Sequence, residues 1–170
     1  MASLVEDLLN ILSQEKDGYD RLYSLSEKKR DAIVHQKLPK LEELVTKEQN
    51  VSSDLKNLEN KRVAALKGMS AVLGHDDELL TVTQIIDLLA NQPKEQEALR
   101  TARDELVRSA NRMQLLNEQN AILLQQAMEM VQFDLNLFKN LKQAPETANY
   151  NKGAYNTGDY LPSGGFDAKQ

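Results

Sequence analysis

Hydrophobic residues recur every three or four positions along most of the chain, and the longest such register runs from Leu99 to Leu141. We call its positions the seam. Ten of the thirteen seam positions are apolar, which is the period of a coiled-coil helix rather than that of a strand. The seam consists of Leu99, Ala102, Leu106, Ser109, Met113, Leu116, Asn120, Leu123, Ala127, Met130, Asp134, Leu137 and Leu141.

A second stripe, here called the flank, accompanies the seam and changes character near residue 118. Its first half is largely polar and its second half is apolar. At about 100° per residue, the apolar arc of the helix widens there to roughly 160°, so the sequence predicts additional cover for this half. The flank consists of Arg100, Arg103, Val107, Ala110, Gln114 and Asn117, followed by Ala121, Leu124, Met128, Val131, Leu135 and Phe138.

Two long helices are predicted at the start of the chain. Ser3 and Glu6 have the spacing of a capping box, which predicts a helix start. Pro39 disfavours helical geometry in the residue before it and predicts that the first helix ends near Lys37. Gly74 suits the left-handed conformation that follows a helix and predicts the end of the second helix.

A short helix and a long one complete the prediction. Thr81 and Gln84 repeat the capping-box spacing, and Pro93 suits the first turn of a new helix, where its missing N–H costs no hydrogen bond. At 1.5 Å per residue, the first two helices are about 50 Å long and the last about 70 Å. We therefore predict an all-α, antiparallel long-helix coiled-coil bundle with a short connecting helix, in which part of the last helix is unmatched. The predicted helices span about residues 3–37, 40–73, 82–91 and 93–142.

The composition changes after Lys142 to Asn, Gly, Ser and Asp, and four of the chain's seven glycines lie there. Residues 1–142 are therefore predicted to form one helical domain, and residues 143–170 an irregular, flexible tail. The tail nevertheless carries spaced aromatic residues, which a purely solvating segment would not need: Tyr150, Tyr155, Tyr160 and Phe166.

Composition excludes several classes of partner. The net charge is -5 with both signs interspersed, so no basic stripe is available for nucleic acid. No apolar run approaches the roughly 20 residues of a spanning helix, and no secretory signal begins the sequence, so membrane insertion is not expected. Cysteine is absent, which fits a reducing compartment, and a cytoplasmic protein is expected.

Catalytic chemistry has no evident basis in the sequence. His35 and His75 have no second imidazole or carboxylate at metal-ligand spacing, so both are expected to be exposed residues near turns. The acidic run 76–78 matches no Ca²⁺ loop and is expected to be solvated. Phosphate loops and nucleophile elbows are also missing. We expect no enzymatic activity, no metal site and no cofactor.

Polar residues within the apolar register leave two interpretations open. A buried asparagine needs an amide partner, so Asn120 either fixes the register of a bundle layer, with Asn117 beside it, or recognises a partner. Asp134 is the acidic residue in the apolar half of the seam, and beyond the end of a bundle it would face water.

The segment Asn117–Leu124 reads N-x-x-N-x-x-L-L late in a long helix, and it is followed by a tail that contains Tyr150 and Gly153. In these features, and in size, acidity and lack of cysteine, the chain resembles the FlgN family of bacterial flagellar export chaperones. The resemblance implies a cytoplasmic protein that escorts hook–filament junction proteins to the flagellar type III export apparatus. It also implies that the C-terminal helical region holds the client.

Site residues follow from this resemblance. The tail of the family carries a tyrosine before a glycine that docks at the export gate component, and this implies Tyr150, with Tyr155 ahead of Gly158 as the competing match. The implied client-binding residues are Asn117, Asn120, Leu123, Leu124, Met128, Val131, Leu135 and Phe138.

The hypothesis is that an amphipathic C-terminal helix of the client lies against the apolar flank and completes the bundle. Such binding would cover the client's own assembly surface and prevent premature assembly. The competing interpretation is a structural coiled-coil module, in which the same stripe closes a homo-oligomer and holds no client. Self-association is compatible with both interpretations, because a client can displace a second copy.

Overall fold

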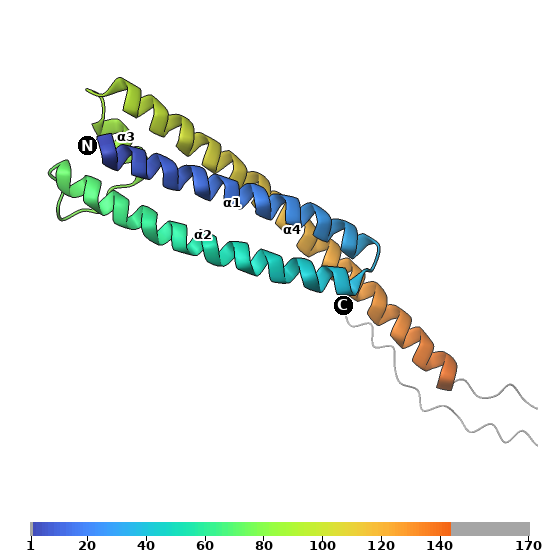
Figure 1. Ribbon diagram of the computed structural model, residues 1–170. Coiled ribbons are helices and arrows are strands. Elements are labelled where there is room, and N and C mark those ends of the chain that lie inside the picture. The colour runs from blue at the N-terminus through green and yellow to red at the C-terminus, as the bar shows by residue number, and fades with distance from the viewer. Residues whose placement is uncertain (1, 144–170) are drawn as a thin grey trace, which may run out of the picture. The chain divides into compact units, whose positions relative to one another are not determined.

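The computed structural model describes residues 2–143, and this part of the chain is helical without strands (Figure 1). The predicted all-α fold is therefore confirmed. By its contacts the chain divides into two units between Met128 and Glu129, so that the division falls within the last helix, and the described part of the second unit is residues 129–143. The helices are α1 (Ala2–Val34), α2 (Leu38–Val72), α3 (Val82–Leu88) and α4 (Pro93–Gln143).

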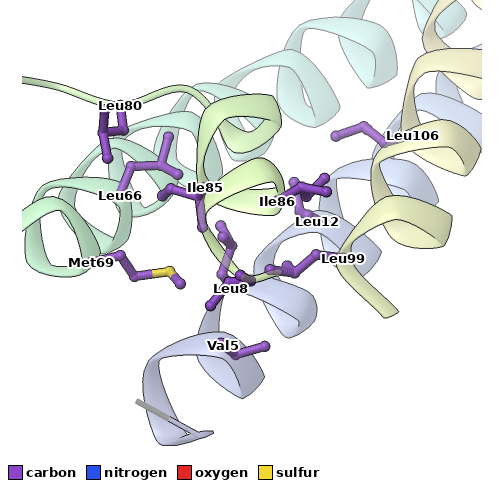
Figure 2. Packing of buried hydrophobic residues seen from close by; sticks show 11 residues of the cluster. Val5, Leu8, Leu12, Leu66, Met69, Leu80, Ile85, Ile86, Leu99 and Leu106 are labelled. Carbon is purple, nitrogen blue, oxygen red and sulfur yellow. The ribbon is translucent and has the colours of Figure 1, made fainter. Parts of the chain in front are cut away.

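In the first unit, α1 and α2 form an antiparallel hairpin, and α4 up to Met128 runs in the same direction as α1 (Figure 1). The main hydrophobic core lies at the end of the hairpin where α3 sits, and Figure 2 shows side chains from all four helices meeting there. The buried members of this core are Val5, Leu8, Leu12, Leu66, Met69, Leu80, Ile85, Ile86, Leu89, Leu99 and Leu106.

The end of α1 differs from its prediction. The helix ends at Val34 rather than near Lys37, because Gln36 adopts a left-handed conformation with φ 53°. The N–H of Lys37 then donates to the carbonyl of Ala32 at 2.8 Å, which is the long bond of a Schellman motif. Pro39 lies in the first turn of α2, which begins at Leu38 rather than at residue 40.

The other helix ends follow their local signals more closely. Gly74 has φ 80°, and the N–H of His75 donates to the carbonyl of Ser70 at 2.9 Å, so the same motif ends α2 where glycine predicts it. Thr81 and Gln84 form the predicted capping box at the start of α3. The start of α1 is earlier than predicted, because the helix already includes Ala2, whereas Ser3 was expected to cap it.

Gly18 on α1 faces Leu55 on α2 at short distance. A Cβ at Gly18 would lie 2.6 Å from Cδ2 of Leu55 and 3.0 Å from its Cγ. By contrast, a Cβ at Gly68 would lie 4.0 Å from Cδ2 of Leu4. A side chain at position 18 would therefore require Leu55 to move, whereas one at position 68 would make ordinary van der Waals contact.

We expect Gly68→Ala to stabilise the chain by about 1 kcal/mol, because alanine is the better residue in a helix interior. Gly18→Ala receives the same helical benefit but must displace Leu55, so we expect a net loss of about 1 kcal/mol. Urea denaturation of the two variants measures the difference. A gain of equal size at both positions would show that α1 and α2 do not approach closely at Gly18.

Candidate functional site

Asn120 marks the last fully buried layer along α4 in the described chain. Its side chain is 1% exposed, and its Nδ2 donates to the backbone carbonyl of Ser26 on α1 at 2.7 Å. Its Oδ1 is also buried and has no hydrogen-bond partner among residues 2–143. Asn120 therefore fixes the register of α4 on α1, as the bundle-layer interpretation expected, while one acceptor stays unsatisfied.

Charged groups surround this layer and tie the hairpin together. Ser26 Oγ donates to one carboxylate oxygen of Glu48 on α2 at 3.3 Å. Lys29 Nζ donates to the other at 2.8 Å, and both side chains of this ion pair are largely buried. The layer thus joins α1, α2 and α4 through Ser26, whose backbone carbonyl bonds to Asn120 and whose hydroxyl bonds to Glu48.

A second polar contact lies about two turns earlier on α4. Arg112 donates to Asp20 at 3.2 Å, and its guanidinium carbon lies 4.1 Å from the ring centre of Tyr23. Burial by itself would raise the pKa of Asp20, but hydrogen bonds from Lys16 and Ser109 hold that pKa below its usual value. This carboxylate is therefore kept ionised beside Arg112, which secures α4 on α1.

The α1–α2 contact contains a buried carboxylate of its own. Glu15 is 3% exposed and accepts a hydrogen bond from Arg62 of α2 at 3.2 Å. Burial raises the pKa of Glu15, and the charge of Arg62 opposes that rise only in part. The pair therefore joins α1 to α2.

The side chains of α4 are more exposed after Asn120 than before it. Leu123 and Ala127 are half-buried, and every described residue from Met128 to Gln143 is exposed. Ten large apolar side chains are exposed in this stretch of α4, from 38% for Leu124 to 66% for Leu141. We call this set the α4 apolar face: Ile122, Leu124, Met128, Met130, Val131, Phe133, Leu135, Leu137, Phe138 and Leu141.

Most of the site residues predicted from the sequence lie on or beside this face. Asn117 is exposed one turn before it, and Leu123 is half-buried at its edge. Asn120 lies beneath the surface, so a direct contact between it and a partner stays a prediction. The predicted gate-docking residues, Tyr150 and the competing Tyr155, lie outside the described residues. The predicted residues that are members of the face are Leu124, Met128, Val131, Leu135 and Phe138.

Half of the α4 apolar face was missing from the predicted site. Three of the missing residues are seam positions, and the other two belong to neither stripe. A signal was present in the sequence, because the predicted last helix is longer than the first two and its far seam would lack neighbours. The missing residues are Ile122, Met130, Phe133, Leu137 and Leu141.

Potential metal ligands do not cluster in the described helices. Within residues 2–143, no three histidine, aspartate or glutamate side chains come together at a site that could hold a metal ion. His35 contacts Asp31 at 3.0 Å, and His75 lies 4.0 Å from Glu78, each a pairing close in sequence. None of the described helices has the length and apolarity needed to cross a bilayer.

Comparison with models of known protein families shows to which family the chain belongs. The family model described as FlgN protein matches residues 1–157, which include all four helices and both candidate tyrosines of the tail. The chain belongs to the FlgN family. FlgN proteins are flagellar export chaperones that bind export substrates, and the family is not known for enzymatic activity. No curated protein and no solved structure matches the chain.

Proposed function

We propose that this FlgN family member binds hook–filament junction proteins through the α4 apolar face, which receives their amphipathic C-terminal helices. The observation that carries the proposal is the uninterrupted exposure of α4 from Met128 to Gln143, which includes seven large apolar side chains after residue 129. Exposed apolar patches of this kind mark interaction surfaces on folded proteins. A helix laid into such a face is a common mode of peptide recognition.

The energy available from this face supports a stable complex. Burying the five predicted flank side chains at about 1.5–3 kcal/mol each gives on the order of 8–15 kcal/mol before the costs of association. Micromolar to nanomolar affinity is compatible with that range. Met128 and Met130 are both exposed, and their flexible, unbranched side chains can repack against more than one client.

Binding at this face would also protect the client. A junction protein whose C-terminal helices are covered cannot use them for polymerisation, so the complex would stay unassembled in the cytoplasm until export. The export gate would then receive the complex through the tail, with Tyr150 as the proposed docking residue and Tyr155 as the competing one. No catalytic step, metal or cofactor enters this proposal.

The proposal is tested by mixing the purified chain with a purified hook–filament junction protein. Size-exclusion chromatography with light scattering should show a complex that contains both proteins. A mixture in which the junction protein elutes alone, while the chain elutes as a homo-oligomer, would contradict the proposal and support the structural coiled-coil module.

Deletion of residues 144–170 is expected to separate binding from delivery. The truncated chain retains the α4 apolar face, so its affinity for the junction protein should stay within about twofold of the full-length value. Secretion of the junction protein by cells should fall strongly, because the proposed gate-docking tyrosines are lost. A large loss of affinity would instead make the tail part of the client site.

A further inference from the structure

We propose that the client covers the α4 apolar face with two helices rather than one, and that the helix on the seam side carries a lysine or arginine opposite Asp134. The inference rests on the proposed function and adds the form of the partner. The stretch of α4 that these two helices would cover is residues 129–143, all of which are exposed.

Exposed apolar side chains in this stretch form two stripes. The seam stripe contains Met130, Leu137 and Leu141, and the flank stripe contains Val131, Leu135 and Phe138. At about 100° per residue, the centres of the two stripes lie roughly 100° apart around the helix. With Phe133, the apolar arc reaches roughly 200°, and the remaining sector carries only polar side chains.

The first unit shows how wide an arc of α4 is covered by two neighbouring helices. There α4 has two long neighbours: Asn120 contacts α1, and Met113 borders the same surface depression as Leu55 of α2. The buried and half-buried positions from Leu99 to Asn120 nevertheless span only roughly 140°. Because two helices cover that arc, a single client helix would leave much of the wider arc after residue 129 in water.

Charges distinguish the two stripes. Asp134 lies within the seam stripe, and no ion pair to it is found among residues 2–143. A helix that packs there must supply a cation or leave a buried charge unpaired, which is costly. In the flank stripe, Nζ of Lys142 lies 5.5 Å from the ring centre of Phe138. The client helix on this stripe would therefore meet a positive charge near the C-terminal end of α4. A parallel second copy fits less well, because its own Asp134 would face this one.

Site-specific crosslinking tests the number of client helices, and the absence of cysteine from the chain makes single-cysteine variants simple. Leu135→Cys and Leu137→Cys place a photoreactive label on the flank and seam stripes, and Asn136→Cys places it on the polar sector as a control. Full-length hook–filament junction protein is the probe. We expect the two stripe labels to capture two segments of the probe that are separate in its sequence, and the control to capture little.

Other results would overturn the inference in distinguishable ways. Capture of one and the same probe segment from both stripes would show a single client helix, and the proposed function would stand. Capture from neither stripe would contradict the proposed function itself. Capture of a second copy of this chain from the seam label, with the probe bound only at the flank label, would assign the seam to self-association.

Affinity measurements give a second test that does not depend on crosslinking. Met130→Ala with Leu137→Ala, and Leu135→Ala with Phe138→Ala, should each weaken binding of the probe by about tenfold or more. Asp134→Lys should weaken it more than Asp134→Asn does. If the variant with Met130→Ala and Leu137→Ala bound the probe with unchanged affinity, no client helix would lie on the seam stripe. If Asp134→Lys bound it with unchanged affinity, the client would carry no lysine or arginine opposite Asp134.

Discussion

Replacement of Val131 and Leu135 by aspartate is expected to weaken binding of a hook–filament junction protein by at least about 100-fold. Two apolar contacts are lost, and two charges must be desolvated against the client. The side chains are 49% and 51% exposed, so the free energy of unfolding of the chain should hardly change. Isothermal titration calorimetry measures the affinity, and urea denaturation measures the stability.

A matched control lies on the other side of the same helix. Gln132→Asp with Asn136→Asp adds the same charge within the same two turns, at positions in the polar sector. This variant should bind the client within about twofold of the unchanged chain. Equal weakening by both double variants would mean that charge, rather than the apolar face, determines binding. Loss of the whole fold by the first variant would mean that the face is core.

Asn120→Asp is expected to lower the free energy of unfolding by about 2–4 kcal/mol. The amide donor to the carbonyl of Ser26 is lost, and a carboxylate oxygen is placed 2.7 Å from that carbonyl in a buried layer. Asn120→Leu removes the unsatisfied Oδ1 as well as the donor, so its stability should equal or exceed that of the unchanged chain. Urea denaturation compares the three proteins.

These variants also test the role of Asn120. Because the side chain is buried in the described structure, Asn120→Leu should leave client affinity nearly unchanged. An Asn120→Asp variant as stable as the unchanged chain would show that position 120 faces water. Loss of client binding by a stable Asn120→Leu variant would support the recognition role that the sequence left open.

Local backbone chemistry made several helix boundaries predictable. Gly74 adopts a left-handed conformation at almost no cost, and the Thr81–Gln84 box satisfies amides at the start of α3. Gln36 gave no comparable signal, because glutamine is not a typical residue for that conformation. The fold class was predictable for a broader reason, since the three- and four-residue spacing of apolar side chains runs through most of the chain.

Burial along the seam could not be read from the pattern alone. Leu116 and Leu137 occupy equivalent seam positions, yet they are 5% and 50% exposed. A heptad register states which side of a helix is apolar, but it does not state whether another helix covers that side. For this reason the flank was predicted as a site, whereas Met130, Leu137 and Leu141 of the seam were not included in the predicted site.

Hydrogen–deuterium exchange of the full-length chain, with and without a hook–filament junction protein, shows where the client is held. Binding at the α4 apolar face is expected to slow exchange of the backbone amides of residues 129–143, while the amides around Leu8 and Ile85 in the core change little. Complex formation without protection of residues 129–143 would contradict binding at this face, because the client would then be held elsewhere on the chain.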